Sequence, residues 1–297
     1  MRLPADLVET LAAAVDAGTM DAAARRLQIT PSAVSQRIKS LEAQVGRVLL
    51  VRSKPVRATE AGNAVVRMAR QLALIEHDAL ADIGVETTAT VTVPLAVNAD
   101  SLATWFLDPL ARLAREHSVV FDIHRDDQDF TAGLLEAGTV MGAVTSRHTP
   151  VAGCRVHPLG ILRYEAVATA GFIARHLPDG PTPAALATAP VIDFDRRDDL
   201  QRRWLEAAGV SPDAPPRHYV PSSADFATAV HLGLGWALLP RIQSQAWLDD
   251  GSLLLLGGPA VDVPLFWQQW DLRSPLLETI ADAVLDAGRR ILAVPVP

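Results

Sequence analysis

The sequence predicts an α/β protein in which a helix-turn-helix segment and a long helix precede a larger region of alternating strands and helices. Three observations support this fold class. Residues 19–45 fit two short helices joined by a tight turn, and residues 59–83 contain no proline and have heptad-like apolar spacing. From residue 90 onward, β-rich runs alternate with helical runs. The chain has 297 residues, enough for two or three domains, and its 49% hydrophobic content suffices for packed cores.

The helix-turn-helix begins after Gly18, which can end a preceding helix in a left-handed cap. Thr19 can then cap a short helix over residues 20–27. After the turn, Thr30 can cap the second helix, and Pro31 occupies the first helical position, where proline is favoured. These residues predict both helix starts.

The second helix is predicted to run from Pro31 to about Val45. Its apolar residues form a single stripe at positions 34, 38, 41 and 45, so the opposite, polar face can enter a major groove. Short or amide side chains there can read base edges, and basic ones can hold phosphates. The base-reading candidates are Ser32, Ser35 and Gln36, and the phosphate candidates are Arg37 and Lys39. From periodicity alone, an ordinary amphipathic helical hairpin is an equal alternative.

The charge distribution favours DNA binding over that alternative. Residues 20–60 contain eight basic and three acidic residues, a net charge of +5. The whole chain has a net charge of −7, so the remainder carries −12. A basic module on an acidic chain is typical of a protein that binds a polyanion through one end only.

Residues typical of an enzyme or a metal site are missing from the sequence. Cys154 is the only cysteine, the eight histidines have no paired ligand spacing, and Gly233-Leu-Gly235 lacks the rest of a phosphate-binding loop. We therefore expect no catalytic residues, no metal and no cofactor. No apolar run approaches the ~18 residues of a membrane span, and the first residues lack the apolar core of a signal peptide. We expect a cytoplasmic protein with no membrane partner.

The long helix is predicted from Thr59 to Ile83, followed by a hinge over residues 84–89. Its apolar residues alternate at spacings of four and three, which is compatible with a helix that pairs with its own copy. Dimerisation would also place two recognition helices in successive major grooves. The alternative is a helix packed on its own domain. The seam residues are Ala61, Val65, Met68, Leu72, Ile75 and Ala79.

The remaining region predicts a parallel sheet, because its strands alternate with helices. The first series has strands at 90–97, 119–124 and 140–145 and helices at 100–115 and 130–137. A second series begins with a strand at 164–169 and continues with strands at 191–194, 218–220 and 236–239. Residues 253–256 are at most a short buried strand.

Ligands of open α/β sheets bind at the carboxyl ends of strands, and four such ends carry suitable side chains. At residues 97–101, Ser101 and nearby backbone N–H groups can hold a carboxylate, and Asp100 can cap the following helix. Residues 125–129 contain three aspartates, which form either a solvated turn or a cation-binding site. The other candidates are Thr145 with Ser146, Ser222 and, more weakly, Asp193 with Asp195.

The motif at residues 30–42, together with Leu49-Leu-Val-Arg52 and Ala58-Thr-Glu-Ala-Gly62, resembles the N-terminal domain of LysR-type transcriptional regulators. The resemblance implies a two-stranded wing at 49–58 whose basic residues flank the phosphate backbone or reach the minor groove. These residues are Arg52, Lys54 and Arg57. The family often has Gln where this chain has Pro31, so base contact at that position is apolar or absent.

The resemblance also implies the domain organisation. Residues 1–58 form a winged helix-turn-helix domain, with the helix-turn-helix at about 17–37, and residues 59–89 form the linker or dimerisation helix and hinge. Residues 90–297 form a two-lobed, periplasmic-binding-protein-like effector domain. Lobe one is 90–162 plus 268–297, lobe two is 163–267, residues 265–270 are the return crossover, and the C-terminal helix at 276–292 returns to lobe one.

Residues 96–105, 142–144, 154–160 and 222–223 resemble one subgroup of the family, the LysG/ArgP type, which senses basic amino acids and controls their exporters. The implied effector is L-lysine, with L-arginine and L-histidine as further candidates. It would promote transcription at an exporter gene. The implied site residues are Asn98 and Ser101, with Asp127 as partner of the effector side chain.

The expected partners are double-stranded DNA, the effector and a second copy in a dimer or tetramer, with RNA polymerase as a further candidate. Two alternatives remain open. One is a LysR-type regulator with a different small-molecule effector, and the other is a solute-binding receptor without DNA function.

Overall fold

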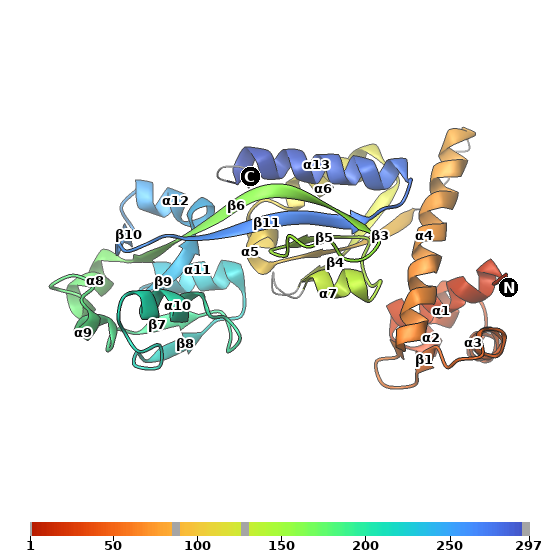
Figure 1. Ribbon diagram of the computed structural model, residues 1–297, viewed down its shortest axis with the longest axis horizontal. Helices are drawn as coiled ribbons and strands as arrows, with labels where there is room; N and C mark the ends of the chain where they lie inside the picture. Colours follow the sequence, from red (N-terminus) through yellow and green to blue (C-terminus); the bar gives the residue numbers. More distant parts are fainter. Residues whose placement is uncertain (1, 85–89, 126–130, 293–297) are drawn as a thin grey trace.

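The computed structural model describes residues 2–84, 90–125 and 131–292 and has an elongated shape (Figure 1). The N-terminal helices lie at one end of the molecule beside the long helix α4. The α/β region extends from α4 as two lobes joined by two long strands (Figure 1). Within the described ranges, no helix combines the length and apolar character that a membrane span requires.

The N-terminal domain contains the predicted helix-turn-helix. It consists of α1 (Ala5–Ala17), α2 (Met20–Arg26) and α3 (Pro31–Val45). The predicted caps are confirmed, since the Thr19 hydroxyl accepts the N–H of Ala22 at 3.1 Å and the Thr30 hydroxyl accepts that of Ala33 at 3.2 Å. Helix α3 has the predicted bounds; Val34, Ile38 and Leu41 of its apolar stripe are buried in one core with α1, and Val45 is partly buried against that core.

The predicted wing is also present. Strands β1 (Leu50–Val51) and β2 (Arg57–Ala58) pair antiparallel. The Glu42 carboxylate of α3 accepts the N–H of Leu49 at 2.8 Å and that of Leu50 at 3.3 Å. The wing is therefore hydrogen-bonded to the C-terminal part of α3.

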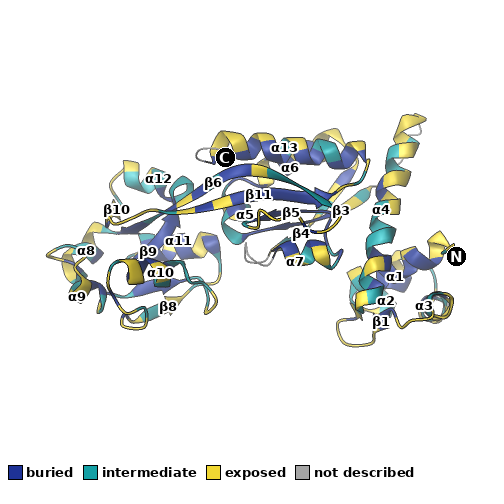
Figure 2. Ribbon diagram, in the orientation of Figure 1, coloured by how far each residue is buried: buried dark blue, intermediate teal, exposed yellow. Residues whose placement is uncertain are grey.

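Helix α4 (Glu60–Asp82) follows, capped by the Thr59 hydroxyl. The predicted seam divides into two parts along it. Val65 is buried in the core of the N-terminal domain, and Ala61 and Met68 pack against that core, so the first half packs on its own domain. Leu72 and Ile75, further along, remain 42% and 44% exposed, and Figure 2 shows the far half of α4 mostly exposed. Among the described residues of the predicted seam, those beyond Met68 lie outside the N-terminal core, although the same part of α4 also places Leu74 in the core of lobe one.

Lobe one is built on the parallel strands β3 (Val91–Val97), β4 (Val119–Arg125) and β5 (Gly142–Thr145), in the order β4-β3-β5. Its helices are α5 (Ala99–Thr104), α6 (Leu107–Glu116) and α7 (Thr131–Glu136). The prediction of one helix at 100–115 is wrong, because the helix is interrupted at Trp105 and Phe106. Both rings are buried in the same core, edge to face at 5.8 Å. Adjacent residues of a continuous helix would not face the same side.

Two antiparallel strands connect the lobes, β6 (Cys154–Ala168) and β11 (Val261–Trp270). Strand β11 contains the predicted return crossover and also pairs antiparallel with β5, so the sheet is mixed rather than wholly parallel. The strand predicted to begin at residue 164 is the second half of β6. Helix α13 (Pro275–Ile291) packs on α6 and β6 in lobe one, as the resemblance implied.

Lobe two combines short strands with small helices. Its strands are β7 (Val191–Asp193), β8 (Arg217–Tyr219), β9 (Ala237–Pro240) and β10 (Leu254–Leu255), and its helices are α8 (Ala170–His176), α9 (Pro183–Leu186), α10 (Leu200–Ala207), α11 (Ser223–His231) and α12 (Arg241–Asp249). The prediction of a buried strand at 253–256 is only partly right, because Leu254 and Leu255 are exposed at the sheet edge. Since β6 and β11 pass through the predicted lobe boundaries, those boundaries stay predictions.

Candidate functional site

The first candidate surface is the polar face of α3 with the wing. Pro31, Ser32, Gln36 and Lys39 are exposed on α3, and Ser35 is half-buried. Thr30 is occupied in capping the helix and also forms a 2.9 Å hydrogen bond with the Ser32 hydroxyl. In and beside the wing, all three predicted basic residues are exposed: Arg52, Lys54 and Arg57.

Arg37 lies differently from its neighbours on α3. Its guanidinium donates to the Thr10 hydroxyl at 3.3 Å and lies 3.9 Å from the Asp6 carboxylate, both on α1. The side chain is 35% exposed. Arg37 therefore holds α3 against α1, a role that the sequence did not indicate.

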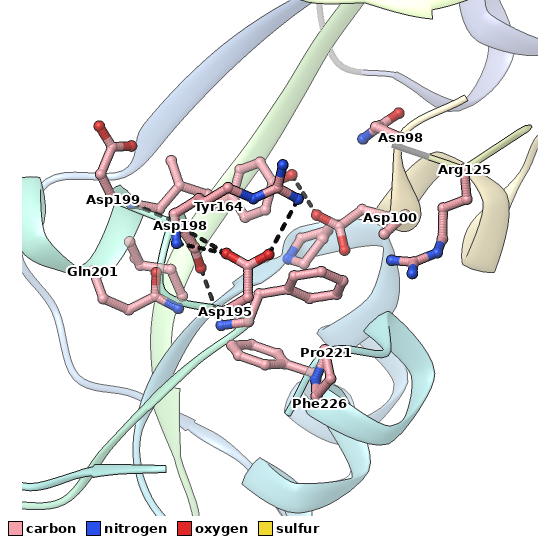
Figure 3. A pocket seen from close by; sticks show the side chains of 16 residues that line it. Asn98, Asp100, Arg125, Tyr164, Asp195, Asp198, Asp199, Gln201, Pro221 and Phe226 are labelled. Atoms are coloured by element: carbon pink, nitrogen blue, oxygen red, sulfur yellow. Dashed lines mark hydrogen bonds and ion pairs between the residues drawn. The ribbon is translucent and has the colours of Figure 1, made fainter. Parts of the chain in front are cut away.

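The second candidate site is a cavity of about 320 Å³ between the two lobes (Figure 3). Lobe one contributes the β3–α5 junction and the end of β4, and the segment after β7 contributes most of the opposite wall. Figure 3 shows Asn98 and Arg125 on one side and Asp195, Asp198, Asp199 and Gln201 on the other. The lining residues are Asn98, Ala99, Asp100, Arg125, Tyr164, Phe194, Asp195, Arg197, Asp198, Asp199, Leu200, Gln201, Pro221, Phe226, Leu238 and Pro240.

Asp100 joins three elements at the cavity wall. Its carboxylate accepts hydrogen bonds from the Tyr164 hydroxyl of β6 at 2.6 Å and from the Ser223 hydroxyl of α11 at 2.7 Å. Burial raises the pKa of Asp100, and these two hydrogen bonds offset the rise only in part. The prediction that Asp100 caps α5 is wrong, because Asn98 occupies the N-cap position.

The opposite wall is an acidic loop in which backbone N–H groups donate hydrogen bonds to the aspartate side chains of the same loop. Asp195 accepts the N–H groups of Arg197 and Asp198 at 2.7 and 3.1 Å, and Asp198 accepts those of Phe194 and Leu200 at 3.2 and 3.1 Å. Burial acts to raise the pKa of Asp195, but the hydrogen bonds from Arg197 and Asp198 outweigh it and the pKa falls. For Asp198, burial prevails and raises the pKa to about 6.

Two buried carbonyl oxygens at the cavity have no hydrogen-bond partner among the described residues, Asn98 Oδ1 and Gln201 Oε1. Asn98 is 3% and Gln201 is 2% exposed. The Gln201 amide donates to the Ile192 carbonyl at 3.0 Å, which fixes the side chain. Buried acceptors are costly when unpaired, so this arrangement favours a ligand that supplies N–H donors.

The charges of the lining also favour a cation. Carboxylates outnumber guanidinium groups four to two in the lining. Asp195 lies 3.4 Å from the Arg197 guanidinium and Asp199 lies 2.5 Å from that of Arg203, whereas Asp198 has no guanidinium partner among the described residues. The Arg125 guanidinium lies over the Phe194 ring at 5.7 Å, across the space between the lobes. Arg125 can therefore meet an anionic group of a ligand whose other end faces the aspartates.

Among the described residues, the cavity lining contains two of the predicted effector-site residues, Asn98 and the weaker candidate Asp195. Ser101 is fully buried behind Asn98, and its hydroxyl has no partner among the described residues. Thr145 is buried, its hydroxyl accepts the N–H of Arg147 at 3.2 Å, and it lies outside the lining, as does Ser146. Ser222 is also outside, whereas its neighbour Ser223 contacts Asp100. Asp127 lies outside the described residues.

Sequence reasoning missed several polar residues of the cavity wall, among them Tyr164, Asp198, Asp199 and Gln201, whereas Arg125 begins the predicted strand end at residues 125–129. One usable signal was the acidic run after β7, in which Asp195 was a weaker candidate. Asp193, named with it, is outside the lining and pairs instead with Arg217.

A winged helix-turn-helix joined by a long helix to a two-lobed α/β domain with a cavity defines a ligand-responsive DNA-binding regulator. Residues 5–63 match the bacterial regulatory helix-turn-helix protein profile of the lysR family, and residues 90–289 match the LysR substrate binding domain. The chain belongs to the LysR family of transcriptional regulators.

Several relatives are similar over nearly the whole chain. The lysine export transcriptional regulatory protein LysG of Corynebacterium efficiens is 42% identical, over 95% of this chain and 97% of its own. The crystal structure of ArgP from Mycobacterium tuberculosis is 46% identical with a TM-score of 0.84, covering 98% and 99% of the two chains. Full-length LysG from Corynebacterium glutamicum with bound effector Arg is 38% identical with a TM-score of 0.75, again covering 98% and 99%. These relatives are transcriptional regulators.

Proposed function

We propose that this LysR-family regulator senses a basic amino acid, L-lysine or L-arginine with L-histidine as a further candidate, in the cavity between its lobes. The proposal rests on two features that occur in the same cavity. Two buried acceptors, Asn98 Oδ1 and Gln201 Oε1, have no hydrogen-bond partner among the described residues, and carboxylates outnumber guanidinium groups in the lining. The similar C. glutamicum regulator has arginine as its bound effector, which supports the same chemistry.

The proposed binding mode assigns one end of the ligand to each wall. The α-carboxylate pairs with Arg125, and the ammonium or guanidinium of the side chain lies toward Asp195, Asp198 and Asp199. Donors from the ligand satisfy Asn98 and Gln201. A charge-assisted hydrogen bond at each end would hold the ligand across both lobes, so that binding favours one lobe arrangement.

The proposed output is activation of a gene for an exporter of basic amino acids. The printed name of the C. efficiens relative, a regulator of lysine export, supports this target. We further propose that the exposed half of α4 pairs with a second copy, as a dimer or within a tetramer, and that Pro31, Gln36 and the exposed basic residues of α3 and the wing contact DNA. Because DNA is the partner, we place the protein in the cytoplasm.

A thermal-shift screen of the twenty amino acids tests the effector assignment. A ligand present at 100 times its Kd adds about 2.7 kcal/mol of stability, which is a measurable rise in Tm. We expect the largest rise with arginine, lysine or histidine. A larger rise with a neutral or acidic amino acid would point to a different effector. Gel retardation on the upstream DNA of the protein's own gene, repeated at rising salt, tests the proposed DNA binding.

A further inference from the structure

Arg70, near the middle of α4, contacts three separate parts of the chain. Its guanidinium donates to the Asp16 carboxylate of α1 at 2.5 Å. It also donates to the carbonyls of Gly138 and Thr139, each at 2.6 Å, in the turn between α7 and β5. The side chain is 11% exposed. One buried cation therefore joins the DNA-binding domain, the linker helix and lobe one within a single protomer.

The surrounding contacts fix α4 on lobe one. Gly138 has a φ of +68°, and a Cβ at this position would lie 2.7 Å from the Arg67 Cβ, so the turn packs directly on the helix. The Arg67 guanidinium lies 4.6 Å from the centre of the Trp270 ring. Leu74 is buried in the core of lobe one. The helix that carries Arg70 therefore belongs to both cores.

The turn held by Arg70 is connected to the cavity through α7, β5 and β3. Helix α7 is tied to β5, because the Thr131 hydroxyl donates to the Val144 carbonyl at 2.8 Å. Strand β5 pairs with β3, and β3 leads to Asn98 in the cavity wall. In Figure 1, α7 and β5 lie between the cavity side of lobe one and α4. A shift of lobe one at the cavity would thus move the turn at residues 138–139.

We propose that Arg70 couples the effector cavity to the DNA-binding domain within one protomer. If the turn is displaced, the two hydrogen bonds of Arg70 to its carbonyls change, and the ion pair between Arg70 and Asp16 changes with them. Asp16 lies in the last turn of α1, against which α3 packs, and its carboxylate also lies 3.5 Å from the Arg26 guanidinium of α2. Arg70 is a positioning residue that touches neither effector nor base. The inference depends on the proposed function only for the identity of the effector.

The test compares Arg70→Gln with Arg112→Gln, which changes an exposed arginine on α6. Hydrogen exchange is measured without effector, and DNA affinity is measured with and without saturating L-arginine. In the wild type, arginine is expected to change DNA affinity about fivefold or more. In Arg70→Gln, exchange should rise at residues 137–141 and at the end of α1, and the change in DNA affinity should fall below about twofold. Arginine affinity by calorimetry should stay within about twofold, since Arg70 is outside the cavity.

Arg70→Lys serves as a second variant, because lysine keeps the charge beside Asp16 but lacks the planar fork that meets two carbonyls. Intermediate coupling is expected for it. Full coupling in Arg70→Gln would overturn the proposal, and so would exchange equal to that of Arg112→Gln. If arginine fails to bind the wild-type protein, the effector assignment fails instead, and the exchange comparison still decides whether Arg70 holds the two domains together.

Discussion

At the residue scale, the proposed role of Asp198 as a partner of the effector's cationic group has a consequence for its pKa. Burial raises its pKa to about 6, the N–H groups of Leu200 and Phe194 favour the charged form, and the nearby Asp193 and Asp100 disfavour it. A cation bound beside Asp198 would stabilise the carboxylate and lower this pKa. Below about pH 6, binding must therefore release a proton.

This linkage predicts the pH dependence of effector binding. The affinity for L-arginine should fall as the pH drops from 7 to 5, by at most about tenfold per pH unit for one released proton. Calorimetric titrations over this range check the slope. Asp198→Asn should bind more weakly at pH 7 and lose most of the slope between pH 5 and 7. An unchanged slope in the variant would remove Asp198 from the site.

The recognition helix allows a second prediction at this scale. Gln36 and Lys39 are both exposed on α3, but an amide can read a base edge whereas an ammonium holds phosphate. Gln36→Ala should reduce discrimination between operator variants by about 1–3 kcal/mol. Lys39→Ala should weaken binding to all sequences alike and reduce the salt slope by about one. Competition gel retardation over a salt series separates the two, and identical behaviour would contradict the assigned roles.

At the element scale, the division of α4 leads to a prediction about self-association. Leu72 and Ile75 are exposed, whereas Val65 lies in the core of the N-terminal domain. The double variant Leu72→Glu/Ile75→Glu should shift the protein toward monomer in sedimentation velocity, because two like charges would meet in the seam. Its monomer fold should persist in circular dichroism, since neither side chain is in a core.

A matched control comes from the buried side of the same helix. Leu74→Ala removes a side chain packed in lobe one and should cost about 2–5 kcal/mol of unfolding free energy. It should leave the oligomeric state as in the wild type. Dissociation by Leu74→Ala but not by the exposed pair would place the interface elsewhere.

Local sequence signals predicted the elements whose ends depend on local chemistry. Thr19 and Thr30 each cap the helix expected to follow, because a hydroxyl cap acts within three residues. The break at Trp105 and Phe106 was missed, since it depends on a core shared by the whole lobe. The length of β6 was also missed, because its pairing with β11 joins residues about a hundred positions apart.

At the scale of the whole molecule, the cavity exists only where distant segments meet. The resemblance implied Asn98, and strand-end reasoning selected residues 97–101 around it, because a parallel sheet places such ends together. Strand-end reasoning could not find Gln201 or Asp198, which reach the cavity only once β6 and β11 hold lobe two against lobe one. Tyr164 was equally hidden, since it lies within a crossing strand rather than at a strand end.

The same long-range arrangement relates ligand binding to DNA binding. The cavity draws on both lobes, and Arg70 ties lobe one to the DNA-binding domain. A ligand changes DNA affinity only if it binds one arrangement of these parts better than the other. In the proposed binding mode the cationic end of the ligand is central to that difference, because the acidic loop lies in lobe two and Arg125 in lobe one.

The most direct test of the account is a calorimetric comparison of L-arginine with L-citrulline, its neutral analogue of similar shape. If carboxylates of the acidic loop hold the cationic end, arginine should bind saturably and citrulline at least about tenfold more weakly, since a hydrogen bond to a charged group contributes about 1.5–3 kcal/mol. Equal affinity for the two, or no binding of arginine, lysine or histidine, would contradict a cavity built for a basic amino acid.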